Sequence, residues 1–530
     1  MNRLDGFLRD RVDCYEIVVG EEDAEMPEMV EFYNYKEAIK MINKHMSNES
    51  IIKLHADVDM DGIGCGYIMN TFLKNVSSNA DIKACINKEK IHGLSDKHVK
   101  YFNSSNANLV IIMDSSSNHI ELIKQINCDV LVIDHHEVLH NELSGDTAGG
   151  KYIIVNNMIS NGNKYKAEPR MSGAMVVYEL LRQYQKEYLN EDILDSKMLY
   201  QWVGVTLLTD VIPTGNKRNQ WYMDNTVYKS ETEISLSVML AIIDSRQHKL
   251  DKSFINYKLA PVFNRAIRAG ASAEALNIAL NKPSEVDNLS IYKDIQDKIL
   301  DRVSYTLTDE KVFEDTEKLN IVEKDNYCLC DITNTSISKS YTGLIATKML
   351  DIRNKNAIAG LLREETNFID GSFRGKCSNI DYRKSIAEKG YFSEGHHGAF
   401  GLKVPKNEVD TIMDDIGILE NSVDNRPYLT AGDVLERYQG KYHIDDFNAF
   451  KKAGLLIRLA IANSKLSTHE SVNIVIPNDD FEEIASGDNW RKVKIFGLEC
   501  WVFETLKTEF LNLYVEFSGE IKAYLKNRWM

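Results

Sequence analysis

The residues best suited to chemistry lie in the segment LHADVDMDG, residues 54–62, which contains His55, Asp57, Asp59 and Asp61. Carboxylates two residues apart at the end of a strand can reach neighbouring hard cations, and glycine lets the backbone turn sharply beside them. The segment therefore predicts a divalent metal site. A solvated acidic turn is the simpler alternative.

An EF-hand calcium loop also opens with D-x-D-x-D-G, so the same segment has to be compared with that motif. Such a loop ends with a glutamate at its twelfth position, which counted from Asp57 is Ile68. It also lies between two helices, whereas IIKLHA at 51–56 has the apolar, β-branched pattern of a strand. Both features exclude an EF-hand.

Two further apolar runs end in metal-ligating side chains. Asp114 follows LVIIM, and Asp134, His135 and His136 follow VLVI. Taken alone, Asp114 could be a helix cap, and the two histidines could belong to a turn. Together with the first motif they make a set of imidazole and carboxylate ligands of the kind that binds Mn²⁺ or Mg²⁺. Asp210, in LLTDVIP, is a further acid at the end of an apolar segment.

These side chains are positioned by an alternation of short apolar runs and helical stretches. The runs cover 51–56, 109–113, 130–133 and 152–155, and helical spacing follows at 172–208. This pattern predicts a mainly parallel sheet in an α/β fold. Because open α/β sheets bind ligands at the carboxyl ends of their strands, we expect the acids and histidines to meet at one edge.

The 530 residues are enough for several domains, and the sequence pattern changes along the chain. The C-terminal part contains the strand-like runs SVNIVI, KVKIFGL and CWVFE, whose aromatic residues we expect to form an ordinary core. We predict an N-terminal helical segment at 1–45, a parallel-sheet domain at 46–230, a long helical connector at 231–315, a smaller α/β domain at 316–415, and a C-terminal α+β or small barrel-like domain at 416–530.

Composition limits the function classes. The 63 Lys and Arg against 79 Asp and Glu give a net charge of −16, which argues against bulk coating of nucleic acid and leaves room for an acidic metal site that handles phosphates. The longest apolar stretches, such as LLIRLAIA at 455–462, are too short to cross a membrane. The N-terminus lacks an apolar segment of signal-peptide length, and the eight cysteines include no C-x-x-C, so we expect reduced thiols and a cytoplasmic location.

The order of HADVDMDG, IIMDSSS, VIDHHE and LLTDVIP resembles the DHH phosphoesterase superfamily, and within it the RecJ-type single-strand-specific exonucleases. The resemblance covers about residues 50–405 and implies a DHH domain followed by a DHH-associated domain. It implies that His136 faces the scissile phosphate and that Asp57 and Asp134 orient the ligands. It also implies two divalent metal ions, Mn²⁺ or Mg²⁺, bridged by Asp114, with the ligands His55, Asp59, Asp61, Asp114, His135 and Asp210.

Further segments are similar to the family's substrate-binding motifs. SGAMVVYELL resembles its S-G-A helix start, and APVFNRAIRAGASAEALNIAL resembles its P-R-x-N-A-x-G-R segment, with Val262 in place of the first Arg. GSFR and EGHHGAFG resemble the G-S-x-R and G-G-H-x-x-A-x-G of the DHH-associated domain, with Glu394 in place of a Gly. A solvated basic helix face at 244–270 and a tight turn at 394–401 are the alternatives. The phosphate-binding residues implied by the resemblance are Asn264, Arg268, Ser372, Arg374, Gly395, His396 and His397.

The function implied by the resemblance is metal-dependent hydrolysis of single-stranded nucleic acid from an end, with DNA favoured and 5′ to 3′ polarity. The first alternative is a nanoRNase or (cyclic) dinucleotide phosphodiesterase of the same superfamily, although those enzymes usually show H-x-x-P-D-x-D-A, where this chain has Val58 before Asp59 and Gly62 after the third acid. The second alternative is a non-catalytic single-strand-binding replication or repair scaffold, which is expected to lose metal ligands. Bacterial members often carry an oligonucleotide-binding barrel near the C-terminus, and we expect a replication or repair protein as a partner and no membrane association.

Overall fold

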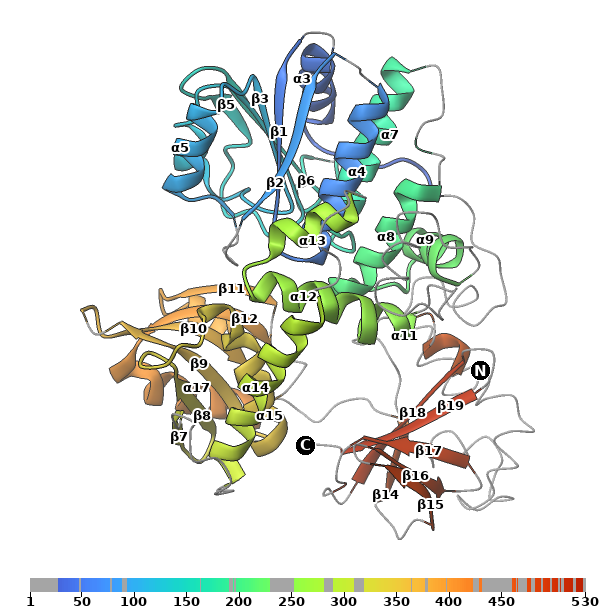
Figure 1. The fold of residues 1–530 in the computed structure, drawn as a ribbon, viewed down its shortest axis with the longest axis vertical. Helices are drawn as coiled ribbons and strands as arrows, with labels where there is room; N and C mark the ends of the chain where they lie inside the picture. The colour runs from blue at the N-terminus through green and yellow to red at the C-terminus, as the bar shows by residue number, and fades with distance from the viewer. Residues whose placement is uncertain are drawn as a thin grey trace. The chain divides into compact units, whose positions relative to one another are not determined.

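The computed structural model, drawn in Figure 1, separates the chain into two units. One unit consists of residues 1–287 and 429–526, and the other of residues 288–428 and 527–530. The first boundary falls inside the predicted helical connector. The structure describes residues 27–46, 49–76, 79–87, 93–162, 164–189, 194, 197–228, 252–280, 289–308, 319–363, 365–376, 380–396, 398–422, 429–430, 460–463, 465, 474–477, 482–487, 490–495, 498–503, 506, 510–517 and 521–527.

The predicted parallel sheet lies in the first unit. It runs in the order β2-β1-β3-β4-β6-β5, and every neighbouring pair is parallel except β5 with β6. The four predicted runs are β1, β3, β4 and β6, whereas β2, which is only partly buried and therefore lacks a long apolar run, was not predicted. The strands are β1 (Ile51–Ala56), β2 (Asp81–Ile86), β3 (Leu109–Met113), β4 (Asp129–Asp134), β5 (Ser144–Asp146) and β6 (Lys151–Asn156).

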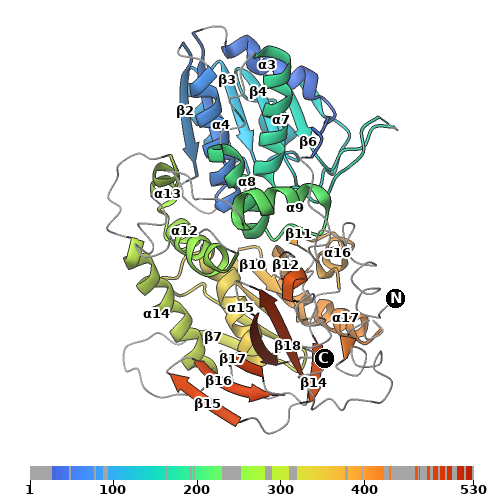
Figure 2. The same ribbon diagram turned by 90° about the vertical axis from the view of Figure 1, so that its right-hand side faces the viewer.

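Helices cover both faces of this sheet (Figure 1), one of which is turned toward the viewer in Figure 2. The helices α3 (Tyr35–Met46), α4 (Met60–Val76) and α7 (Gly173–Tyr188) pack on one face, and α5 (Asp96–Ser104) and α6 (Ile120–Ile123) pack on the other. Because both faces are buried, β3 reads as the continuous apolar run LVIIM instead of an alternating pattern. The strand order reverses between β1 and β3, which makes the carboxyl ends of these strands the expected place for a ligand.

The helices after the sheet are α8 (Lys197–Thr209), α9 (Lys217–Met223), α11 (Lys252–Phe254), α12 (Ala260–Arg268) and α13 (Ser272–Ala279). Gly270, with φ 86°, separates α12 from α13. The helix α13 packs on α4 and β2, and the Ser272 hydroxyl donates to the carbonyl of Asn87. This pair of helices therefore belongs to the parallel-sheet unit. Within the described parts of the chain, no helix combines the length and apolar composition needed to cross a bilayer.

The second unit is built on a mixed sheet in the order β11-β12-β10-β9-β8-β7, in which β8 and β9 are parallel and the other pairs antiparallel. Helices α14 and α15 pack on one face and α16 and α17 on the other. The predicted boundary at 415/416 lies inside α17. The elements are α14 (Leu289–Thr308), β7 (Asn320–Glu323), β8 (Tyr327–Asp331), α15 (Thr342–Arg353), β9 (Asn356–Arg363), β10 (Phe368–Arg374), α16 (Tyr382–Ala387), β11 (Phe392–His396), β12 (Ala399–Pro405) and α17 (Val409–Ser422).

The C-terminal part of the first unit is a further sheet in the order β13-β14-β18-β19-β17-β16-β15. The three predicted runs correspond to β14, β16 and β17. The strands are β13 (Leu429–Thr430), β14 (Ile474–Pro477), β15 (Glu482–Gly487), β16 (Trp490–Ile495), β17 (Leu498–Val502), β18 (Phe510–Phe517) and β19 (Ile521–Asn527).

Side chains alternate across this C-terminal sheet, so one face is apolar and buried and the other carries an aromatic row. In the row, the ring centroids of successive members lie 5.2, 6.2, 6.4 and 5.9 Å apart. Trp490 is 37% exposed and Phe503 is 60% exposed, so the prediction of an ordinary aromatic core is wrong for these two residues. The aromatic row consists of Trp490, Trp501, Phe503, Tyr524 and Tyr514.

Candidate metal centre

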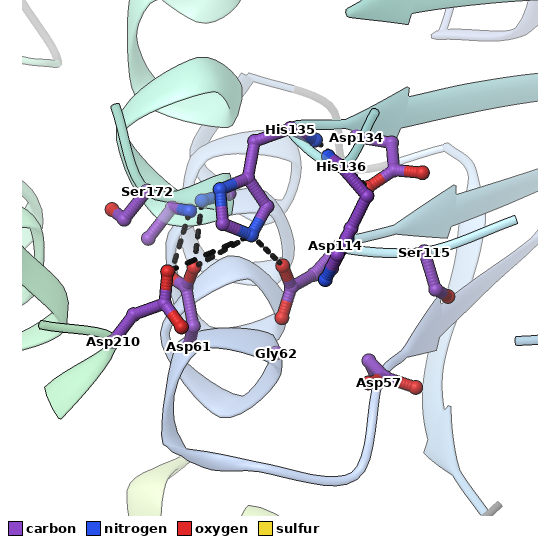
Figure 3. A network of polar contacts seen from close by, with 12 residues as sticks. Asp57, Asp61, Gly62, Asp114, Ser115, Asp134, His135, His136, Ser172 and Asp210 are labelled. Atoms are coloured by element: carbon purple, nitrogen blue, oxygen red, sulfur yellow. Dashed lines mark hydrogen bonds and ion pairs between the residues drawn. The ribbon is translucent and has the colours of Figure 1, made fainter. Parts of the chain in front are cut away.

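Polar side chains from distant parts of the sequence meet at the carboxyl edge of the parallel sheet (Figure 3). Asp57 follows β1, Asp114 follows β3, and Asp134 ends β4 with His135 and His136 directly after it. Since β1, β3 and β4 are consecutive in the sheet, their ends lie side by side. The predicted meeting of acids and histidines at this edge is therefore present in the structure.

His135 is the centre of one group of ligand atoms. Its Nε2 lies 3.1 Å from Asp114 Oδ1, 3.8 Å from Asp61 Oδ2 and 3.7 Å from Asp210 Oδ2. Its Nδ1 donates to the carbonyl oxygen of Met171 at 3.0 Å, so Nε2 keeps its lone pair for a ligand. Ligand atoms of Asp61, His135 and Asp210 all lie within 4.8 Å of one another, close enough for one ion to contact all three.

A second group consists of Asp57, Asp59 and Asp114, whose carboxylate oxygens also lie within 4.8 Å of one another. Asp59 Oδ1 accepts hydrogen bonds from the backbone N–H of Asp61 and of Gly62, both at 3.0 Å, and so caps α4. Asp114 has a left-handed backbone with φ 65° directly after β3. It lies close to both groups, which is the position expected of a carboxylate that bridges two ions.

The start of α7 positions the first group through its backbone. Gly173 N–H donates to Asp61 Oδ2 at 2.6 Å, and Ala174 N–H donates to Asp61 Oδ1 at 3.0 Å. A side chain at position 173 has no room, because a Cβ there would lie 2.5 Å from Asp114 Oδ1. The hydroxyl of Ser172 caps the helix. The S-G-A segment thus has a physical role at each of its three residues.

The acids at this edge are buried without enough positive charge around them. Asp61 is 2% exposed and Asp114 is 1% exposed. Burial and neighbouring carboxylates raise the pKa of Asp61 to about 7, and they raise the pKa of Asp114 and of Asp210 well above the ordinary value. Asp114 Oδ1 is buried and accepts no hydrogen bond. A divalent cation relieves both the repulsion and the missing contact, so this set of carboxylates and an imidazole fits Mn²⁺ or Mg²⁺.

Asp134 is a carboxylate of a different kind, because it holds the two histidines in place. Its Oδ1 accepts from the backbone N–H of His135 at 2.8 Å and of His136 at 3.2 Å, and from His136 Nδ1 at 2.8 Å. Burial acts to raise its pKa, but the charge and hydrogen bond of His136 outweigh burial and lower the pKa. The His136 side chain is 48% exposed, against 10% for His135, so His136 is the imidazole that faces outward.

His55 is not brought to this cluster. Successive side chains of a strand point to opposite faces, and His55 lies on the face of β1 that is covered by α5. Its ring centroid lies 5.0 Å from that of His98 and 5.6 Å from that of Phe102. Burial, with a contribution from His98, lowers the pKa of His55 to about 3. None of the ligand groups found among the described residues includes His55, so its assignment as a metal ligand stays a prediction.

Two residues at the site were not predicted. Cys65 follows Asp61 by one turn of α4, and its sulfur lies within 4.8 Å of ligand atoms of Asp61 and Asp114. The i, i+4 spacing was the available signal. Asn156, the last residue of β6, donates to the carbonyl of His136 at 2.9 Å and so fixes the loop after β4. Its position at a strand end, like those of the acids, was the available signal.

The predicted phosphate-binding residues Asn264 and Arg268 lie on α12 in the first unit, and both are half-buried. They are four residues apart and therefore share one face of the helix. Arg246 and Lys249, which contribute to the predicted basic stretch, lie outside the described residues. The phosphate-binding role of α12 stays a prediction.

In the second unit, Ser372 and Arg374 lie on β10 beside the start of α15. Ser372 Oγ is 2.8 Å from Thr342 Oγ1, and Arg374 donates through Nε to Thr347 Oγ1 at 3.2 Å and through Nη1 to the preceding carbonyl at 2.7 Å. Burial lowers the pKa of Arg374, and no described carboxylate forms an ion pair with it. A half-buried guanidinium without an acid partner is suited to a phosphate oxygen.

The Gly- and His-rich segment of the second unit forms the hairpin of β11 and β12. Gly395 has φ 133°, a conformation that side-chain-bearing residues rarely adopt. His396 is the last residue of β11, and His397 lies outside the described residues. The described residues of the segment thus lie mainly on two paired strands, and a contact of these residues with phosphate stays a prediction.

Comparisons with known proteins agree with this architecture. Residues 50–200 match the model of the DHH family, N-terminal domain. The single-stranded-DNA-specific exonuclease RecJ of Bacillus subtilis (strain 168) is 20% identical over 440 residues, which cover 80% of this chain and 52% of the relative. The chain therefore spans about half the length of this curated relative.

Two crystal structures share the fold at low identity. RecJ in complex with Mn²⁺ from Thermus thermophilus has a TM-score of 0.66 at 14% identity, covering 100% of this chain and 78% of the other. Exonuclease RecJ bound to manganese has a TM-score of 0.53 at 17% identity, covering 75% of this chain and 97% of the other. The predicted resemblance is confirmed: residues 50–200 match the DHH family, N-terminal domain, and the chain has a fold of the RecJ type.

Proposed function

We propose that the protein is a metal-dependent phosphodiesterase that hydrolyses single-stranded nucleic acid from one end. The observation that carries this proposal is the pair of ligand groups that share the neighbourhood of Asp114. Two groups of hard ligands around one buried carboxylate are the arrangement used to hold two cations against one phosphate. The low identity to RecJ leaves substrate and polarity as parts of the proposal.

The proposed cofactors are two divalent ions, Mn²⁺ or Mg²⁺. Asp57, Asp59 and Asp114 would hold one ion, with Asp57 as a ligand in place of the predicted ligand His55 and not only as an orienting acid. Asp61, His135 and Asp210, together with Asp114, would hold the other. When bound, such ions activate water and neutralise charge on the phosphate and on the leaving oxygen. Met171, Gly173 and Ala174 keep His135 and Asp61 in place through backbone hydrogen bonds.

His136 is proposed as the side chain that binds the scissile phosphate. Its Nδ1 is held by Asp134, which leaves Nε2 as the donor on its exposed side. A hydrogen bond from this nitrogen to a non-bridging phosphate oxygen would strengthen as negative charge develops in the transition state. Asp134 acts through His136 and is therefore a positioning residue.

Arg374 and Ser372 are proposed to bind a phosphate of the strand in the second unit, with Asn264 and Arg268 of α12 as further phosphate contacts. Arg374 retains guanidinium N–H groups beyond its two protein hydrogen bonds. The aromatic row of the C-terminal sheet supports a single-stranded substrate, because exposed rings can stack on unpaired bases without reading their sequence. Lys492 Nζ lies 5.0 Å from the Trp501 ring centroid and forms an ion pair with Glu499.

We further propose DNA as the preferred substrate, 5′ to 3′ polarity, a replication or repair protein as a partner, and a cytoplasmic location. The printed name of the Bacillus subtilis relative, a single-stranded-DNA-specific exonuclease, supports the substrate.

The test uses single-stranded DNA 30-mers labelled at either end, a duplex of the same sequence and a dinucleotide, each with Mn²⁺ or with EDTA. We expect metal-dependent shortening of the single strand from its 5′ end and no comparable loss of the duplex. Cleavage of the dinucleotide alone would replace the proposal by the dinucleotide phosphodiesterase. Binding of the 30-mer without cleavage under any metal condition would replace it by the non-catalytic scaffold.

A further inference from the structure

Cys65 lies beside two carboxylates of the cluster and has no role in the proposed hydrolysis. It is fully buried on α4, one turn after Asp61. Its sulfur and one oxygen each from Asp61 and Asp114 lie within 4.8 Å of one another, and all three residues are buried. A single ion of ordinary radius can therefore contact the sulfur and both oxygens at once.

The surroundings of Cys65 differ from those of the other buried cysteines. Cys128 packs in the apolar core beneath α5 and α6, and Cys328 and Cys330 pack in the apolar core beneath α15. None of these three belongs to a ligand group among the described residues. Cys65 differs from these three because its sulfur lies within 4.8 Å of oxygens of two buried carboxylates.

A second observation points to a ligand at the same place. Asp114 is 1% exposed, and its Oδ1 accepts no hydrogen bond although it is completely buried. Leaving a buried carboxylate oxygen without a donor is costly, and a positive ion beside it removes the cost. Figure 3 shows this oxygen turned toward Asp61 and His135 at the centre of the cluster.

We propose that Cys65, Asp61 and Asp114 form a binding site for a thiophilic divalent cation, Zn²⁺ or Cd²⁺, which competes with Mn²⁺ or Mg²⁺ for the shared carboxylates. Thiolate ligands favour Zn²⁺ and related soft cations, whereas an all-oxygen and imidazole set favours Mn²⁺ and Mg²⁺. When the sulfur–metal bond forms, the thiol proton passes to solvent, and no oxidant or reductant is involved. The centre would thus be sensitive to zinc through a residue outside the proposed hydrolytic machinery.

The experiment is a titration of the metal-free, full-length protein with Cd²⁺, followed by the ultraviolet thiolate-to-metal charge-transfer band and by calorimetry. The wild type is expected to develop this band with the first equivalent of Cd²⁺. Cys65→Ser should lose the band and bind Cd²⁺ at least about tenfold more weakly. It should keep its Mg²⁺ affinity, because Mg²⁺ takes oxygen ligands. Cys128→Ser is the matched control, and it should keep the band.

A band that persists in Cys65→Ser, or one that is absent from the wild type at one equivalent, would overturn the proposal. Circular dichroism of each variant checks folding. If Cys65→Ser does not fold, X-ray absorption of the Cd²⁺-loaded wild type decides the matter. One sulfur among oxygen neighbours supports the site, and a shell of oxygen and nitrogen alone refutes it. The measurements use no nucleic acid, so a protein without nuclease activity can still pass or fail them.

Discussion

The candidate metal centre of the first unit has an excess of buried negative charge, whereas the Arg374 region of the second unit has an excess of positive charge. In the first, Asp61 and Asp114 are buried among other carboxylates, and Asp114 Oδ1 accepts no hydrogen bond. In the second, Arg374 is held only by neutral groups, and no described carboxylate pairs with it. The buried carboxylates of the first region outnumber its cationic partners, and the guanidinium of the second region has no described carboxylate partner. The difference indicates a cation as the ligand of the first and an anionic group as the ligand of the second.

The largest expected effect comes from removing the carboxylate that lies near both ligand groups. Asp114→Ala should reduce metal-dependent cleavage by about 10³-fold or more, because the charge stabilisation given by a metal centre amounts to several kcal/mol. The measurement is the initial rate of end-labelled 30-mer shortening at saturating Mn²⁺. Asp146→Ala removes an exposed carboxylate of the same unit and serves as the control. If Asp114→Ala keeps a tenth of the wild-type activity, the proposed cation-binding role of this carboxylate is refuted.

The proposed binding of an anionic group in the second unit is tested at Arg374. Arg374→Ala should raise KM for the 30-mer by about 10- to 100-fold, the equivalent of one charge-assisted hydrogen bond of about 1.5–3 kcal/mol. Its Mn²⁺ affinity, measured by calorimetry, should match the wild type. Arg363→Ala, which removes a more exposed arginine on the neighbouring strand, should change neither quantity. A fall in metal affinity together with an unchanged KM would mean that Arg374 does not act on an anionic substrate.

The position of the first ligand group is tested at Gly173. Gly173→Ala places a Cβ 2.5 Å from Asp114 Oδ1, so the carboxylate or the start of α7 has to move. Mn²⁺ affinity should fall about tenfold, the lower end of the effect of displacing a group that orients metal ligands. Gly417→Ala in α17, where the nearest atom to the added carbon is 3.6 Å away, should leave it unchanged. Equal affinities for both variants would show that the backbone of α7 does not position the ligands.

The smallest expected effect comes from replacing Asp129, a carboxylate of the parallel-sheet domain that has side-chain hydrogen-bond partners. Asp129 accepts hydrogen bonds from His45 at 2.9 Å and Lys44 at 2.7 Å, which lower its pKa although burial acts to raise it. Because the folded pKa lies below the unfolded value, this stabilisation is present at neutral pH and is lost as the pH falls below about 4. Asp129→Asn should cost about 1 kcal/mol of unfolding free energy at pH 7.

The measurement is urea unfolding of wild type and Asp129→Asn from pH 7 downward. The difference between the two proteins should shrink toward acid pH, and the Mn²⁺ affinity should be the same in both. If the difference stays constant with pH, the carboxylate of Asp129 is not the source of the stabilisation, and Asp129 cannot serve as the reference for comparison with Asp114.

The sequence predicted the parts of the fold that are buried on both sides. The central strands β1, β3 and β4 read as apolar runs because helices cover both faces, and each ends in a polar side chain that faces the site. Strand β2, at the edge, and β10, whose FIDGSFR alternates between buried and half-buried positions, gave no such run. A partly covered strand resembles a loop in a single sequence, because its exposed positions are free to be polar.

At the site, the sequence predicted the identity of the candidate ligands more accurately than the direction of their side chains. His55 and Asp57 are two residues apart, yet only Asp57 belongs to a ligand group, because His55 lies within β1 on the α5 side and Asp57 comes after the strand has ended. For Cys65 the sequence predicted only a reduced thiol, although this residue follows Asp61 by one helical turn. Direction along a strand or helix depends on the register of the element, which the motif alone does not determine.

The start of α7 has a consequence for how the chain tolerates change. Across four residues, Met171 offers a carbonyl to His135, and Gly173 and Ala174 offer N–H groups to Asp61. Alanine scanning would overlook most of this support, since all three residues act through backbone groups that an alanine substitution retains. A one-residue insertion or deletion between positions 171 and 174 would shift these backbone groups out of register together. The geometry of the site therefore depends on the length of this segment as well as on its side chains.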